Sequence, residues 1–338
     1  MTKRIFFTFA ILTEALGFAP SFAHAGSELG IRKVVQIVTG RTPLDPFRRP
    51  QGVVADTTRG IVLVSDSGNH RVVTFDSRWR TRGSIAFPSP YSREPLRLAL
   101  DARKRIFLAD GMAHEIVVLS ALGTPITSFL PRLSETDTAF VTPQDIAISS
   151  SGRIFVLLSG DEPGIVVLEA NGSRAEGFES APSRTLQSPQ AIAVNADESL
   201  IAVADPFADQ PVVLFNGKGE RVSSFGSHGE VEGGSSLAID VTWAPDGTLW
   251  VTDNLRHSIS VFTSRGECLG KIGGFGYAPG QFAYPVSCEF LAPDRILVLE
   301  QANARFQVLE VGIPSLEEGT GRLETAGSAL VGTERGTP

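Results

Sequence analysis

Short apolar runs recur along the chain, and clusters of turn residues separate them. Two of the clearest pairs of runs read PQGVVADTTRGIVLVSD at 50–66 and PQAIAVNADESLIAVAD at 189–205, each with a turn in the middle and an acid at the end. Runs this short with turns at both ends are typical of β-strands, and Ser151-Gly152 and Asp246-Gly247 between runs are typical of hairpin turns. The pattern predicts an all-β chain built from hairpins.

The same pair of strands is repeated along the chain. The units begin at Pro50, Pro95, Pro143, Pro189, Ala238 and Pro285, which are 45 to 49 residues apart. In most units two further short strands follow the pair before the next unit begins. Four strands at this period are the signature of one blade of a β-propeller. The sequence therefore predicts a six-bladed β-propeller of four-stranded blades.

The two ends of the repeat indicate how the ring closes. The sixth unit supplies strands at 287–291, 295–299 and 305–311 and then stops one strand short. An unpaired strand at 33–38 precedes the first unit. We expect it to complete the sixth blade as its outer edge, because closure of this kind removes exposed sheet edges. The propeller domain is expected to span 26–312.

The segments outside the repeat have a different composition. Residues 1–25 combine Lys3 and Arg4, an apolar stretch and Ala23-His24-Ala25, which together are typical of a secretory signal peptide. This interpretation implies export to the periplasm or out of the cell. Residues 313–338 are rich in Gly, Glu, Ser and Thr and are interpreted as a disordered tail. No later apolar run is long enough to cross a bilayer.

Charge and cysteine content narrow the class of protein. The chain has 30 Lys+Arg against 37 Asp+Glu, a net charge of −7 that becomes −8 without the signal peptide. An acidic chain with no basic cluster is a poor partner for nucleic acid or anionic lipid. Cys268 and Cys288 are expected on an outermost and an innermost strand, too far apart for a disulfide, and are predicted to be buried free thiols. We expect a monomeric ring.

Two motifs carry a resemblance to a known family. The segment GGFGYAPGQFAYP at 273–285 resembles the G-x-G-x-G-x-F-x-x-P start of an NHL repeat, and DSGNHR at 66–71 resembles its D-x-x-N-x-R signature. EQANAR at 300–305 is a second copy, and 253–257 is a partial one. The resemblance implies a six-bladed propeller. It also implies a role in binding or scaffolding, although six-bladed relatives include lactonases with a channel Ca²⁺ and a lyase with a metal site.

An acid ends the second strand of five units. These acids are Asp66, Asp110, Asp205, Asp253 and Glu300. An acid at this place can accept backbone N–H groups of the next loop, and Arg71 and Arg305 can donate to carbonyls or acids of a neighbouring blade. A catalytic site needs one cluster and not a copy per blade. We therefore interpret these groups, with Asn69 and Asn303, as a structural clamp.

Three histidines lie four residues after their acids, at His70, His114 and His257, and so belong to one ring of loops. One interpretation is a metal or acid–base site on the loop face. The other is that histidine is simply common before the third strand. The second is preferred, because loops of different blades are far apart for ligands that must approach a zinc to about 2.1 Å. No metal site is assigned.

Charged residues also interrupt the innermost strands. By period-two alternation, the second and fourth residues after each unit's start face the central axis. Most are small, but the charged exceptions are Arg97, Asp145, Asp240 and Glu289. Three carboxylates in a channel suit Ca²⁺ or a polar ligand. An ion-pair set around Arg97 is the alternative and is preferred, because structural ion pairs often imitate functional sites.

Two functions follow. The first is an exported binding or scaffolding module that holds a protein, a glycan or a small polar ligand through its loop face. The second is a metal-dependent enzyme, similar to a lactonase or a lyase, that uses the channel mouth. No nucleophile elbow and no H-E-x-x-H motif is found in the sequence. The first function is preferred, and calcium in the channel is the only cofactor considered.

Overall fold

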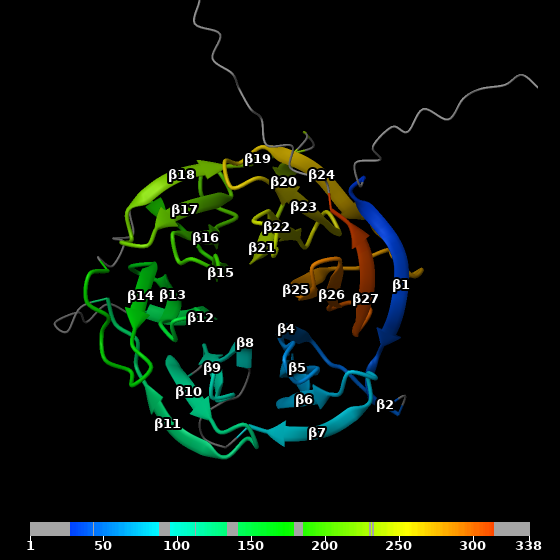
Figure 1. The fold of residues 1–338 in the computed structure, drawn as a ribbon, viewed down its shortest axis with the longest axis horizontal. Coiled ribbons are helices and arrows are strands. Elements are labelled where there is room, and N and C mark those ends of the chain that lie inside the picture. Colours follow the sequence, from blue (N-terminus) through cyan, green and yellow to red (C-terminus); the bar gives the residue numbers. More distant parts are fainter. Residues whose placement is uncertain are drawn as a thin grey trace, which may run out of the picture.

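The computed structural model describes residues 28–42, 44–87, 95–111, 113–133, 141–178, 185–229, 231 and 233–313. Their strands form six radial sheets around a central axis, like the blades of a fan (Figure 1). The predicted six-bladed β-propeller is confirmed. The predicted signal peptide at 1–25 and all but the first residue of the predicted tail at 313–338 lie outside the described residues. No helix among the described residues is long and apolar enough to cross a membrane.

Each blade runs from an inner to an outer strand by antiparallel neighbours. Blade one comprises β4 (Pro50–Asp56), β5 (Ile61–Asp66), β6 (Arg71–Phe75) and β7 (Thr81–Ala86). Blade two comprises β8 (Pro95–Leu100), β9 (Ile106–Asp110), β10 (Glu115–Leu119) and β11 (Pro125–Phe129). Blade three comprises β12 (Val141–Ile148), β13 (Ile154–Gly160) and β14 (Gly164–Leu168).

The other three blades follow the same plan. Blade four comprises β15 (Ala191–Val194), β16 (Leu200–Ala204), β17 (Val212–Asn216) and β18 (Arg221–Phe225). Blade five comprises β21 (Ala238–Trp243), β22 (Leu249–Asp253), β23 (Ser258–Phe262) and β24 (Cys268–Gly273). Blade six comprises β25 (Pro285–Ala292), β26 (Arg295–Glu300), β27 (Arg305–Gly312) and β1 (Gly30–Val38). Short elements in the connections are η1 (Ser67–Asn69), β2 (Gly40–Thr42), β3 (Asp45–Pro46), β19 (Ser227–His228) and β20 (Gly234–Ser235).

Blade three departs from the predicted four strands. Its described residues form three strands, and an isolated bridge between Leu168 and Arg174 stands where an outer strand would begin. The turn between the two bridge residues contains Asn171-Gly172, so the chain does reverse as the sequence indicates. Within the described residues, this bridge is all that stands at the outer position of blade three.

The N-terminal strand closes the ring. β1 pairs antiparallel with β27, with Gly30 opposite Gly312 and Val38 opposite Phe306. The first and last described strands therefore lie side by side at the outer edge of blade six (Figure 1). This confirms the closure predicted from the orphan strand.

The hydrophobic core lies between blades and not at the axis. Among the described residues the core forms six clusters, each shared by two neighbouring blades. Each cluster contains one residue of the innermost-strand row, which comprises Val53, Leu98, Ile146, Ile192, Val241 and Cys288. Cys268 and Cys288 are both free, and Cys288 is buried. Cys268 is only half-buried, contrary to expectation, because it starts an edge strand.

The propeller has two different faces. One carries the incoming loops that lead into each innermost strand, such as 274–284, and the loops between second and third strands, such as 254–257. We call it the loop face. The opposite face carries tight turns, such as 57–60 and 120–124, and we call it the turn face. The longer connections thus lie on the loop face, and loops held on a rigid scaffold commonly carry binding residues.

Candidate functional site

The channel on the propeller axis holds all four charged residues predicted to face it. Its cavity measures about 290 Å³ and is lined by the innermost strands. Arg97, Asp145, Asp240 and Glu289 all line it, among small residues such as Gly52 and Ala147. The structure thus brings together residues from four blades at one place. Their contacts decide what this place can do.

Arg97 spans the channel. It belongs to β8 of blade two, and its guanidinium donates to Asp240 Oδ1 of blade five at 2.9 Å and to the carbonyl of Ile239 at 2.7 Å. These two blades lie opposite each other across the axis (Figure 1). The ion pair is well shielded, since the Arg97 and Asp240 side chains are 12% and 8% exposed. It ties opposite sides of the ring together.

The channel carboxylates also join neighbouring blades. Asp145 of blade three accepts the N–H of Ile192 in blade four at 2.9 Å. Asp240 of blade five accepts the N–H of Cys288 in blade six at 2.7 Å. Glu289 of blade six accepts an N–H of blade one, from Ala55, at 3.2 Å. Each acid therefore bonds a backbone group across a blade junction.

Burial changes the acidity of these carboxyls. Burial raises the pKa of Asp145 to about 7, against the opposing effect of nearby Arg97. Burial raises the pKa of Glu289 to about 8, and the charge of Asp240 adds to that rise. The pKa of Asp240 is also raised by burial, although Arg97 opposes the shift. Carboxyls that lose water without a full set of partners take up protons at neutral pH.

The arrangement does not fit a divalent cation. Calcium takes 6–8 oxygen ligands that converge on one point. Instead, oxygens of Asp145, Asp240 and Glu289 bond backbone N–H groups of three different junctions, and Arg97 brings a positive charge into the same space. No three His, Cys, Asp or Glu side chains within the described ranges are grouped to hold a metal. The residues present therefore build an ion-pair and hydrogen-bond set.

The clamp residues of blade one are joined in one network. Asp66 is fully buried and accepts the backbone N–H of Arg48 at 2.6 Å, the Asn69 amide at 2.8 Å and Arg71 Nε at 2.7 Å. The rest of the Arg71 guanidinium binds Asp45 through two hydrogen bonds of 2.7 and 2.8 Å. The pKa of Asp45 is held far below its usual range by its hydrogen bond with Arg71 and then by that with Arg41.

Blade six repeats this network with a longer acid. Glu300, also fully buried, accepts Arg305 Nε at 2.6 Å and the Ala283 N–H at 2.8 Å. The remaining nitrogens of Arg305 donate to the carbonyls of Tyr277 and Gln281, both at 2.9 Å. Asn303 also donates to Glu300. Arg71 and Arg305 were expected to reach a neighbouring blade. Each instead binds the incoming loop of its own blade. The reason is that the acid of that blade holds the arginine Nε and so directs the rest of the guanidinium to this loop.

The other clamp acids also accept N–H groups of their loops, and Asp253 accepts the Ser235 hydroxyl as well, at 2.8 Å. Asp205 accepts the N–H groups of Ser188 and Phe207, at 3.1 and 3.2 Å. Asp253 accepts the N–H of Ser236 at 2.7 Å and that of Arg256 at 3.0 Å. In blade two, the N–H of Ala113 donates to Asp110 at 3.0 Å. Each acid orders a loop of its own blade.

The three histidines share a backbone conformation rather than a site. His70, His114 and His257 have φ of 52°, 59° and 56°, and Ala304 at the equivalent place in blade six has 46°. Histidine is enriched several-fold among non-glycine residues that adopt this left-handed conformation. His114 bonds the Thr142 hydroxyl at 3.0 Å, and His257 accepts the backbone N–H of Tyr284 at 3.0 Å.

Sequence reasoning missed a group of aromatic side chains around His257. The His257 ring lies 4.7 Å from the ring of Phe275 and 4.7 Å from that of Tyr284, and Phe275 lies 5.8 Å from Tyr277. We call these four residues the aromatic cluster. Phe275, Tyr277 and Tyr284 are 58%, 67% and 40% exposed. The sequence does hold a signal for this cluster, since several aromatic residues stand in the glycine-rich segment 273–285. That segment was interpreted only as the start of an NHL repeat.

The family model for the NHL repeat matches residues 47–75, which carry the clamp of blade one. The chain carries an NHL repeat. Together with the six blades, this makes it an NHL-type propeller, as the motifs predicted. No curated protein sequence matches this NHL propeller.

Several solved structures are similar to this NHL propeller in fold. A gluconolactonase from Xanthomonas campestris is 14% identical, with a TM-score of 0.61 over 85% of this chain and 94% of that one. A calcium-binding protein, regucalcin, from Agrobacterium tumefaciens is 13% identical, with a TM-score of 0.59 over 85% and 96%. A streptogramin B lyase is 14% identical, with a TM-score of 0.57 over 82% and 98%. At these identities the likeness establishes the fold alone.

Proposed function

We propose that this NHL propeller is a binding module that holds a protein partner through the aromatic cluster on its loop face. The observation that carries the proposal is the exposure of Phe275, Tyr277 and Tyr284 beside one another. Aromatic residues are enriched at protein interfaces and dominate their binding energy. Leu255, 52% exposed in the loop that also carries His257, adds apolar surface. The partner would be met outside the cytoplasm, as the N-terminal sequence indicates.

The loop that carries the cluster is held in shape before any partner arrives. Phe282 of the same loop is fully buried and anchors it, while Arg305 donates to the carbonyls of Tyr277, Ala278 and Gln281. A loop that is already ordered loses little entropy on binding. The clamp of blade six therefore supports the proposal by presenting the aromatic rings on a rigid base.

The channel supports a structural role more than a catalytic one. A metal-dependent enzyme that uses the channel mouth is the alternative, by analogy with the gluconolactonase and lyase structures that share the fold. In this chain the channel acids bond blade junctions, and Arg97 closes the axis with Asp240. These side chains are therefore already engaged with other groups of the protein.

Site-specific photo-crosslinking tests the binding role. A photoreactive phenylalanine analogue placed at Tyr277 is expected to give a discrete protein adduct in cells that make the chain. The same analogue at Phe207, which is 63% exposed on a loop of blade four, is the matched control and is expected to give none. Equal labelling from both positions, or none from Tyr277, would contradict the proposal.

Elemental analysis of the purified protein tests the enzyme alternative. We expect no stoichiometric calcium and no change in melting temperature when calcium is added. Calcium bound one-to-one, and lost in both Asp240→Asn and Glu289→Gln, would instead support a metal-dependent channel. This result would be independent of the crosslinking result, since the two sites share no residue.

A further inference from the structure

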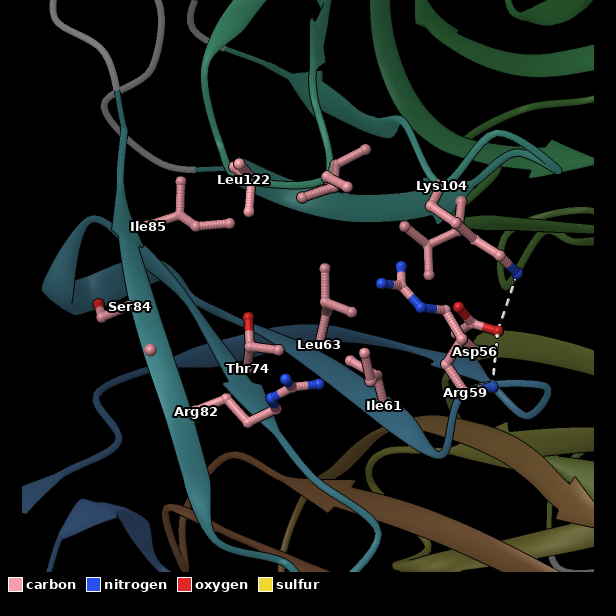
Figure 2. A pocket seen from close by; sticks show the side chains of 14 residues that line it. Asp56, Arg59, Ile61, Leu63, Thr74, Arg82, Ser84, Ile85, Lys104 and Leu122 are labelled. Atoms are coloured by element: carbon pink, nitrogen blue, oxygen red, sulfur yellow. Dashed lines mark hydrogen bonds and ion pairs between the residues drawn. The ribbon is translucent and has the colours of Figure 1, made fainter.

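A second cavity lies between blades one and two, near the turn face (Figure 2). It measures about 350 Å³. Its lining combines the end of β4, the turn 57–60 and strands β5, β6 and β7 of blade one with β8, β9 and two turns of blade two. The lining residues used below are Ile61, Leu63, Ile85 and Leu122 on the apolar side and Arg59 and Arg82 on the charged side. We call this cavity the blade 1–2 groove.

The groove exists because small side chains face the gap between these blades. Thr74, Gly83 and Ser84 line it where larger residues would fill the junction. A Cβ atom added to Gly83 would meet nothing within 4 Å. On the other side, the turn of blade two packs against Ile85, since a Cβ at Gly123 would lie 2.3 Å from that side chain. The two blades are therefore in close contact at Gly123 and Ile85, whereas the space beside Gly83 stays open.

Two positive charges point into this space without an internal partner. Figure 2 shows the side chains of Arg59 and Arg82 directed toward the middle of the groove. Neither guanidinium forms a hydrogen bond or ion pair with any residue in the described ranges. The one acid present, Asp56, is already neutralised by Lys104 Nζ at 2.8 Å. The groove is thus locally cationic on a chain whose net charge is −7.

An unusually exposed apolar residue stands beside these charges. Leu122 is 89% exposed, although it belongs to the groove lining. Contiguous apolar surface, unlike a single exposed leucine, marks binding sites. Ile61, Leu63 and Ile85 continue this apolar surface into the groove.

We propose that the blade 1–2 groove binds a small organic anion with an apolar body and one anionic head. The two guanidiniums bind the head, because arginine forms paired, charge-assisted hydrogen bonds with carboxylate, sulfate and phosphate. The apolar body lies over Leu63 and Ile85 and under Leu122. The volume is at the lower end of the range for ligand pockets, about 300–1,000 Å³, and suits a chain or single ring rather than a large cofactor.

Calorimetric titration of the purified full chain with decanoate tests this proposal. Decanol, which lacks the charge, and acetate, which lacks the apolar body, are the comparison probes. We expect decanoate to bind at one site and both comparison probes to bind at least tenfold more weakly. Arg59→Gln with Arg82→Gln is expected to weaken decanoate at least tenfold, and Leu122→Ser to weaken it severalfold.

The matched control is Arg78→Gln with Arg103→Gln. Both arginines are exposed on turns of the same two blades and make no described side-chain bond, so the same charge is removed outside the groove. This double variant is expected to bind decanoate like the natural chain. Folding is checked by melting temperature, which should be unchanged in both double variants.

Three outcomes would overturn the inference. Equal affinity for decanol and decanoate would show an apolar groove with no role for the arginines. Equal weakening in the control variant would show attraction by overall charge alone. Absence of decanoate binding to the natural chain would exclude this class of ligand from the groove.

Discussion

Among single residues, the charged side chains of the channel join neighbouring blades by hydrogen bonds at positions where most blades have small residues. Glu289 stands at the junction of blades six and one and bonds the N–H of Ala55. Its pKa is raised to about 8 by burial. The side chain is therefore protonated in the folded chain at pH 7, and its ionisation lowers the free energy of unfolding.

This cost makes the free energy of unfolding depend on pH. The folded-state pKa of Glu289 is about 8, whereas its ordinary value is 4.5, so the folded chain holds a proton that the unfolded chain lacks between these values. Stability from this group is fully present below pH 4.5 and is lost as the pH rises to about 8. The slope is up to about 1.4 kcal/mol per pH unit.

Glu289→Gln is expected to remove the part of the slope that Glu289 contributes, because an amide can accept the same N–H bond and carries no charge. Above pH 8 the variant should be more stable than the natural chain by about 1–3 kcal/mol. The measurement is urea unfolding between pH 5 and 9. Asp294→Asn, an exposed acid of the same blade, is the control and should leave the slope unchanged. Parallel curves for Glu289→Gln and the natural chain would contradict the prediction.

At the element scale, the loop 274–284 depends on glycines that admit a neighbouring ring. Gly273 has φ of 86°, and a Cβ there would lie 2.3 Å from the ring of Phe282, which anchors the loop. Gly247, in a hairpin turn of blade five, also has φ of 86°, but a Cβ there would meet nothing within 4 Å. The two positions therefore share a backbone conformation and differ only in the space around it.

Alanine at each position separates these two effects. Gly247→Ala should cost about 1 kcal/mol, the cost of a left-handed conformation with a side chain. Gly273→Ala should cost about 1–3 kcal/mol more, because the added methyl displaces the Phe282 ring. Denaturant unfolding measures both values, and faster amide exchange in 274–284 should accompany the second substitution alone. Equal costs would show that the ring contact does not hold the loop.

At the scale of the whole molecule, one strand from the beginning of the described chain closes the ring. β1 covers the edge of β27, and its apolar residues pack on both sides of blade six. Ile31 and Val34 contact the cluster shared with blade five, and Val35 and Val38 that shared with blade one. The strand therefore stabilises two junctions as well as one edge.

Removal of residues 1–38 is expected to leave the β27 edge unpaired and to cause association of the chain, since unpaired edges bind other strands. The control is a chain that begins at residue 28 and keeps β1. Analytical ultracentrifugation should show the control as a single small species and the shortened chain as larger assemblies. A monomeric shortened chain with an unchanged melting temperature would show that β1 does not close the ring.

The clamp shows how far local reasoning reaches. Asp66, Asn69 and Arg71 lie within six positions, so their hydrogen bonds could be inferred from spacing and turn chemistry. The further partner of Arg71, Asp45, lies 26 residues away and was not inferred. Likewise, no pattern links Arg59 with Arg82, because one stands in a turn and the other on an edge strand.

The number of blades, their four-strand plan and the closing strand followed from the sequence, because each blade is a local unit whose apolar runs and turns recur at a fixed period. The partners of the channel charges did not. Arg97 and Asp240 are 143 positions apart and meet only because the ring sets blades two and five opposite each other. The open groove beside Gly83 and the exposed rings around His257 likewise depend on how separate blades pack, and only the tertiary structure determines that.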